Sequence, residues 1–356
     1  MSRTPRVSVV IPGKDVAGTV TDTLTSLTRQ FDDPGDLEVV VVDDGSTDTT
    51  SDVVESFSPR FPDLSLVVNP APVGLASARN QGLAAARGRY VAYLDADDWL
   101  APGHLPHLAD AMDTLRVDFV RTDHTTVEGR RRSLVRAPQS IRGVPLLPRS
   151  SVLPATERTQ VDYPYAWAGL FDRALAEDGL LTFPDGLFTA EDRPWIWRLY
   201  LHARSYATVD SPGILYRRGL PGSLTQTYDA RQLDVVPALH QAFDVVEADE
   251  EAEVLLTKLA RTTIALTAHH LRRSLRMAPA SRRRLRHGAR SLLARIPADV
   301  LAFETARIHP GRAWALHGLL PHPDPRARYR PPPSVLAAAR VPTRPTSAPI
   351  RSEVAS

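Results

Sequence analysis

The strongest constraint on the fold is an alternation of buried-strand and helical patterns within the first 120 residues. Short, largely apolar runs occur at residues 6–12, 37–42, 64–68 and 89–94. Between them, apolar residues recur at helical spacing over residues 16–27, 46–57 and 74–87. Because strands that are apolar throughout are buried on both faces, this order predicts an α/β fold with a mostly parallel sheet flanked by helices.

Polar clusters follow three of these runs, at residues 13–15, 43–46 and 95–98. In open parallel sheets, ligands bind at the carboxyl ends of the strands. The coincidence therefore predicts a binding site at that edge. Ser46 or Thr47 is also a plausible N-cap for the helix that follows the second cluster.

The rest of the chain divides by composition. Residues 117–122 suggest a further strand, 123–160 a hairpin or loop over the sheet, and 230–320 a helical region. From Pro321 the chain is rich in proline, which is typical of disorder. We expect a catalytic domain over residues 1–228, a helical C-terminal domain over 229–320 and a disordered tail over 321–356.

Composition narrows the classes of function. The net charge is only +2 and there are no cysteines, which excludes disulfides, thiolate metal sites and cysteine nucleophiles. No apolar segment is long enough to cross a membrane and no signal peptide is evident, so we expect a cytoplasmic protein. Residues 129–136 and 271–295 are rich in arginine, and the second segment contains no acid. They are either solvated faces or surfaces for an anionic partner.

Three carboxylates, Asp95, Asp97 and Asp98, crowd the end of the run at 89–94. They form a solvated turn that caps the next helix, a site for Mg²⁺ or Mn²⁺, or an acid/base pair. A second acidic pair, Asp43 and Asp44, ends another strand of the predicted sheet and favours the metal. Such a site suits a nucleotide diphosphate, because the cation neutralises the leaving phosphates.

Four segments together resemble family 2 glycosyltransferases of the GT-A (Rossmann-like) fold. They are VSVVIPGKDVAGTVTDTLTSL, EVVVVDDGSTDTT, PVGLASARNQGLAAARGRYVAYLDADDWL and FTAEDRPWIWRL, and the resemblance covers roughly residues 6–228. It implies an inverting enzyme that uses a nucleotide sugar, usually a UDP-sugar, and Mn²⁺ or Mg²⁺.

The resemblance also implies roles for individual residues. Asp95 and Asp97 match the DxD motif, with Asp97 the better candidate for metal contact. The residues implied in donor binding are Pro12, Lys14, Asp43, Asp44, Arg79, Asp95, Arg217, Arg218 and Ser223. The purely structural alternatives are that Pro12 ends a strand, that Asp44 makes an Asx-turn with Gly45, and that Arg79 lies exposed on a helix.

The sequence departs from the family pattern in the first loop. The usual Pro-x-Tyr-Asn is replaced here by Pro12-Gly13-Lys14-Asp15, so a flexible cation stands where an aromatic flanks the base. Some relatives carry a histidine metal ligand near residue 220, and this chain has Leu220 there. We therefore expect the metal contact of the protein to rest on the DxD motif.

For the acceptor side, the resemblance implies Asp192 as the catalytic base, with Glu191 contacting the acceptor or supporting Asp192. The alternative for Asp192 is a capping box with Thr189. Trp167 and Arg193 are candidates for the acceptor pocket, whereas Trp195 and Trp197 are more typical of a core.

The basic segments suggest an anionic-polymer or lipid-linked acceptor, with peripheral membrane contact; the absence of interleaved aromatics argues against nucleic acid. Such enzymes build cell-surface polysaccharide, teichoic-acid-like polymer or glycolipid, and the C-terminal helices are compatible with a homo-oligomer. Two alternatives remain: a non-catalytic anionic-polymer-binding protein, and a sugar nucleotidyltransferase. The second lacks the glycine-rich basic loop that it needs after the first strand.

Overall fold

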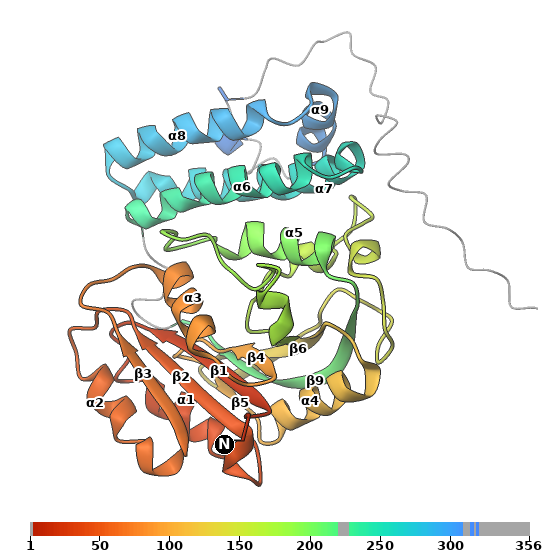
Figure 1. The fold of residues 1–356 in the computed structure, drawn as a ribbon. Helices are drawn as coiled ribbons and strands as arrows, with labels where there is room; N and C mark the ends of the chain where they lie inside the picture. Colours follow the sequence, from red (N-terminus) through yellow and green to blue (C-terminus); the bar gives the residue numbers. More distant parts are fainter. Residues whose placement is uncertain (1–2, 220–227, 309–313, 317, 320–356) are drawn as a thin grey trace, which may run out of the picture.

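The computed structural model describes residues 3–219, 228–308, 314–316 and 318–319. The expected tail at 321–356 and the donor-site candidate Ser223 lie outside the described residues. Figure 1 shows a curled sheet below a stack of helices, with α5 between them.

The described residues form a nine-stranded sheet in the order β3-β2-β1-β4-β8-β6-β9-β5, with β7 paired to β6. The strands are β1 (Val7–Gly13), β2 (Leu37–Asp43), β3 (Asp63–Val68), β4 (Tyr90–Tyr93), β5 (Trp99–Leu100), β6 (Phe119–Glu128), β7 (Arg131–Val135), β8 (Gly169–Asp172) and β9 (Tyr206–Arg217). The first four strands pair in parallel, as the apolar runs predicted. Beyond β4 the pairing is mixed: β8 is antiparallel to both β4 and β6, whereas β6 and β9 are parallel.

The helices are α1 (Val20–Leu27), α2 (Thr50–Glu55), α3 (Leu75–Ala85), α4 (His104–Leu115), α5 (Asp192–His202), α6 (Val235–Glu247), α7 (Ala252–Arg273), α8 (Pro279–Ala294) and α9 (Ala298–Arg307). The prediction of Ser46 or Thr47 as an N-cap is wrong, because α2 begins at Thr50 with Thr49 as its N-cap. Asp48 accepts hydrogen bonds from the backbone N–H and the hydroxyl of Thr50, and so serves this helix end instead.

The core has two parts, one on each face of the sheet. Successive residues of β1 point to opposite faces, so that Val9 packs with α1, α2 and α4 while Val10 packs with α3 and α5. The second part continues without a break through Trp195 of α5 into Leu239 of α6 and Leu259 of α7. A domain boundary at 228/229 stays a prediction, since apolar packing is continuous across it.

Among the residues that the model describes, no helix combines the length and the apolar character that crossing a bilayer requires.

Candidate active site at the carboxyl edge of the sheet

The loops after β1, β2 and β4 meet at one edge of the sheet, because these strands are parallel neighbours. Pro12 is buried within β1, two residues before the exposed Lys14. The Lys14 ammonium donates to Asp15 at 2.8 Å and to the carbonyl of Gly45 at 2.9 Å, which ties the first loop to the second. The hydrogen bond from Lys14, and after it the one from the backbone N–H of Thr47, lower the pKa of Asp15 to about 2.

Asp43 and Asp44 are both buried, and each carboxylate accepts hydrogen bonds from protein groups beside it. Asp43 accepts from the backbone N–H of Ser46 at 2.9 Å and from the hydroxyl of Ser51. Asp44 accepts from the backbone N–H groups of Val73 at 2.8 Å and Gly74 at 2.9 Å, just before α3. The suggested Asx-turn at Asp44 is therefore wrong. Asp43 instead accepts from the N–H three residues on, and Asp44 anchors the loop that leads into α3.

Arg79 is the central cation of this edge. Its side chain is only 4% exposed, and it bridges Glu191 at 2.5 Å and Asp95 at 2.9 Å. The alternative that Arg79 is an exposed helix residue is wrong. Since Glu191 is 112 residues away in the sequence, this one arginine joins the DxD loop to the start of α5.

The three carboxylates after β4 have different surroundings. Asp98 is fully buried and accepts the backbone N–H of Arg217 at 2.6 Å, and its second oxygen has no partner among the described residues. Burial and the neighbouring acids raise the pKa of Asp98 well above its ordinary value. Burial, then the charge of Asp95, raises the pKa of Asp97 to about 6.

The raised pKa values of Asp97 and Asp98 mean that negative charge at this loop is unfavourable. A bound cation would lower both values. Asp95 and Asp97 are the more exposed members and offer hard oxygen ligands. Within the described part of the chain, no group of three or more His, Asp or Glu side chains is placed to hold a metal ion. Mg²⁺ in proteins commonly keeps waters and takes oxygen ligands from substrate phosphates beside one or two carboxylates.

Glu191 and Asp192 lie at the start of α5. The preceding residue, Ala190, has a left-handed backbone with φ of 62°, which is costly for a non-glycine residue and often marks a functional site. Burial raises the pKa of Glu191 to about 7 against the opposing charge of Arg79, and the charge of Asp192 adds a smaller rise. Burial also raises the pKa of Asp192, whose oxygen lies 3.4 Å from Nε of Arg193.

The capping-box alternative for Asp192 is wrong. Thr189 is not the N-cap, and its hydroxyl donates to the carbonyl of Arg231 at 2.8 Å. Asp192 keeps 22% of its side chain exposed at the first position of the helix. Its carboxylate is therefore open to a ligand.

An aromatic cluster lies beside the carboxylates. Trp167 is buried, stacks on Tyr165 at 4.6 Å and lies 5.1 Å from the ring of Tyr216. Tyr216 and Tyr165 are half-buried, and the nearby Asp95 and Asp98 add to burial in raising the pKa of Tyr216 to about 12. Sequence reasoning missed both tyrosines, although the alternation of Tyr163, Tyr165 and Trp167 was a usable signal. Trp195 and Trp197 are core residues, as expected.

The two candidate arginines at the end of β9, Arg217 within it and Arg218 just after it, differ in role. Arg217 donates to the carbonyl of Asp97 at 2.9 Å and to Asp22 at 2.7 Å, and its guanidinium lies over the ring of Trp99. Arg218 is exposed and lies over the ring of Tyr216. Arg217 therefore braces the carboxylate loop, while Arg218 stays available to a ligand.

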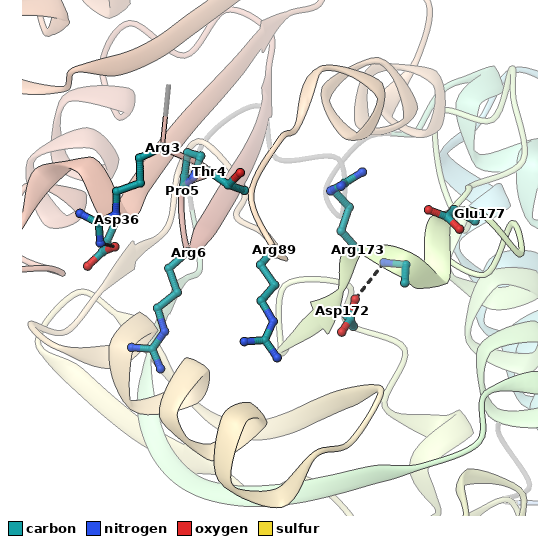
Figure 2. Close-up of a pocket in the computed structure, with 10 residues that line it drawn as sticks. Arg3, Thr4, Pro5, Arg6, Asp36, Arg89, Asp172, Arg173 and Glu177 are labelled. Atoms are coloured by element: carbon teal, nitrogen blue, oxygen red, sulfur yellow. Dashed lines mark hydrogen bonds and ion pairs between the residues drawn. The ribbon is translucent and has the colours of Figure 1, made fainter. Parts of the chain in front are cut away.

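The opposite edge of the sheet carries a hollow of about 590 Å³ at the amino ends of the strands, shown in Figure 2. Arginines line it too, but most have acidic partners. Arg3 pairs with Asp33 and Asp36, Arg6 with Asp110 and Asp113, and Arg89 with Asp113. This edge is balanced in charge, unlike the carboxyl edge.

The chain resembles known proteins in sequence and in fold. Residues 8–178 match the model of the family described as Glycosyl transferase family 2. The uncharacterized glycosyltransferase EpsJ of Bacillus subtilis is 29% identical over 230 residues, which are 62% of this chain and 63% of that protein. The poly(ribitol-phosphate) β-N-acetylglucosaminyltransferase TarS of Staphylococcus aureus is 27% identical over 216 residues, which are 59% of this chain and 35% of TarS.

The match thus spans less than two thirds of either relative. Among solved structures, residues 1–349 of S. aureus TarS in complex with UDP-GlcNAc share the fold, with a TM-score of 0.70 and 21% identity over 87% of each chain. The expected α/β fold with flanking helices and a helical C-terminal part is confirmed. The sheet was expected to be mostly parallel and is instead mixed, because β8 pairs antiparallel with β4 and β6 and β5 pairs antiparallel with β9.

Proposed function

Over residues 8–178 this chain belongs to glycosyl transferase family 2, and we propose that it is an inverting, metal-dependent glycosyltransferase of the GT-A fold. It moves a sugar from a nucleotide sugar, a UDP-sugar in the first instance, to a hydroxyl of a cell-surface polysaccharide, teichoic-acid-like polymer or glycolipid. The observation that carries the proposal is Arg79, which holds Asp95 of the DxD loop and Glu191 beside Asp192 on one buried guanidinium. A donor site and a base are thereby fixed to each other.

On the donor side, Asp97 and Asp95 are the residues that hold Mn²⁺ or Mg²⁺. The cation, when bound, neutralises the charge that develops on the leaving diphosphate. Asp43 and Asp44 hold the loop after β2 in place. Pro12, near the end of β1, and Lys14, on the loop after it, border the nucleotide. Arg217 at the end of β9, Arg218 after it and Ser223, which lies outside the described residues, are the candidates to bind the phosphates.

On the acceptor side, Asp192 takes the proton of the attacking hydroxyl. That oxygen bonds to the anomeric carbon on the face opposite the leaving diphosphate, and the carbon–oxygen bond to the diphosphate breaks. Burial supports this role, because a carboxylate with a raised pKa is a stronger base. Glu191 is held by Arg79 and positions the start of α5, while Arg193 and the aromatic group of Trp167, Tyr165 and Tyr216 border the acceptor.

The basic side of α8 supports a further part of the proposal, peripheral contact with an anionic membrane surface from the cytoplasmic side. Arg283, Arg284 and Arg290 are exposed there, and the nearby Leu275 is 55% exposed. Vesicles containing phosphatidylserine should bind the chain, and neutral vesicles should not. The C-terminal helices are also the candidate surface for a homo-oligomer.

The test is turnover of a panel of nucleotide sugars with Mn²⁺ or Mg²⁺. We expect slow donor hydrolysis that releases a nucleoside diphosphate, stops on chelation and falls at least about 100-fold in Asp97→Asn. Asp110→Asn, an exposed acid of α4 that pairs with Arg6 at the opposite edge, is the matched control and should keep full turnover.

Hydrolysis that persists in excess chelator would contradict the metal. No turnover with any donor would favour the non-catalytic polymer-binding alternative, and net synthesis of a nucleotide sugar from a sugar phosphate would favour the nucleotidyltransferase.

A further inference from the structure

A second cleft lies beside the carboxylate loop. Arg217 and Arg218 in its lining are also donor-site candidates, whereas its other lining residues have no role in the proposed reaction. Its volume is about 780 Å³, and its walls come from α1, β5, the β6–β7 hairpin and the end of β9. Four arginines line it, Arg29, Arg132, Arg217 and Arg218, and we call it the arginine cleft. Trp99, Leu100 and Val127 supply an apolar wall.

The charge of this cleft is not balanced. Asp22 is the single acid in its lining, and Arg217 occupies that acid at 2.7 Å. Arg29 and Arg132 are exposed and, like Arg218, have no carboxylate partner among the described residues. The hollow at the amino edge is the useful contrast, because three of its four arginines, Arg3, Arg6 and Arg89, pair with acids.

The cleft is also connected to the candidate reaction centre. Arg217 stands in its wall, donates its backbone N–H to Asp98 and donates its guanidinium to the carbonyl of Asp97. A ligand in the cleft would therefore lie against the other side of the segment that holds the DxD loop. The catalytic carboxylates repel an anion, so an anionic group of a bound chain is more stable beside the arginines than beside those acids.

We infer that the arginine cleft binds an anionic group, a phosphate or a carboxylate, carried by the acceptor chain away from the hydroxyl that receives the sugar. Guanidinium groups match both anions in bidentate geometry, and the apolar wall suits the carbon skeleton between charged groups. The inference rests on the proposed function and deepens it, since it selects anionic polymers over neutral polysaccharides as acceptors.

The test uses the full chain without metal and two probes, inorganic tripolyphosphate and trigalacturonate, titrated by calorimetry at one fixed salt concentration. Arg29→Gln/Arg132→Gln is the cleft variant, and Arg283→Gln/Arg284→Gln on α8 removes the same charge elsewhere. We expect at least one probe to bind, with its Kd raised about tenfold or more in the cleft variant and nearly unchanged in the α8 variant. The probe that binds identifies the anionic group.

Equal weakening in the two variants, or weakening in the α8 variant alone, would overturn the inference, because binding would then follow total charge or the other surface. Absence of binding by both probes would overturn it as well. Donor hydrolysis by the unaltered chain tests the proposed function separately. A chain that hydrolyses donor but binds neither probe would remove the cleft assignment and leave the enzyme.

Discussion

Arg79 and Arg6 each bridge two acids of this protein, at opposite edges of one sheet. Arg6 pairs with Asp110 and Asp113 and keeps 27% of its side chain exposed, whereas Arg79 pairs with Glu191 and Asp95 at 4% exposure. At the amino edge the charges cancel, and the pKa of Asp113 is lowered, since its hydrogen bonds and arginine neighbours outweigh its partial burial. At the carboxyl edge, Asp97, Asp98, Glu191 and Asp192 all have raised pKa values. Acids with raised pKa values are concentrated at sites that bind a cation or transfer a proton.

The largest expected difference between the edges concerns stability. Arg79→Met removes the partner of two acids and leaves Glu191 buried without a cation, so we expect a loss of about 3–5 kcal/mol in the free energy of unfolding. Denaturant unfolding at pH 7.5 measures it. Donor turnover should fall as well, because the DxD loop and α5 lose their common anchor. A loss below about 1 kcal/mol would mean that the acids of this edge take up protons at little cost and that the comparison is wrong.

Asp192→Asn tests the chemistry of the same edge. The amide is isosteric with the carboxylate but accepts no proton, so transfer to acceptor should fall by about 10²–10⁴ while the Kd for donor stays within about twofold. Calorimetry gives the Kd, and single-turnover transfer gives the rate. If donor binding fails together with transfer, Asp192 belongs to the donor site and not to the base.

Acid pH lowers the stability of the whole fold, so the effects of variants at the two edges are compared near neutral pH. Burial lowers the pKa of His104 to about 3, and this ring shares a hydrogen bond with Ser211 at 2.9 Å. The unfolded chain binds that proton near pH 6.5 and the folded chain does not, so stability is full above pH 6.5 and falls with decreasing pH. The loss from this one residue is about 2 kcal/mol at pH 5.

The measurement is the free energy of unfolding at pH 7.5 and pH 5 in the unaltered chain and in His104→Gln, which cannot titrate. The variant should lose about 2 kcal/mol less over this interval. Parallel pH profiles in the two chains would show that His104 takes up its proton in the folded state.

The smallest expected effect is at the amino edge. Arg6→Gln breaks two ion pairs that water partly screens, so the free energy of unfolding should change by less than about 1 kcal/mol and donor turnover should stay unchanged. Arg6→Gln and Arg79→Met, unfolded side by side, give the comparison directly. If Arg6→Gln lowers the free energy of unfolding as much as Arg79→Met does, the stabilisation comes from the ion pairs themselves and does not depend on burial.

Much of the site was predictable because its residues follow apolar strands. Asp43, Asp44, Asp95 and Asp97 lie at the ends of strands, and the parallel pairing that brings them to one edge follows from the strand–helix alternation. The state of Arg79 was not predictable from α3 alone, whose other buried residues are small. Arg79 is a buried bridge because the tertiary fold brings Glu191 of the distant α5 segment beside it, opposite Asp95.

The sequence by itself determined where the first four strands, the helices between them and the acidic loops lie, because burial of apolar side chains has a local period that each segment carries alone. Tertiary structure decided which acids share a cation, where α5 begins, and that Arg29, Arg132 and Arg218 line one cleft. The physical reason is the range of the interactions. Contacts between residues a hundred or more positions apart depend on the order in which the strands pair, and beyond β4 that order is set by packing across the whole sheet.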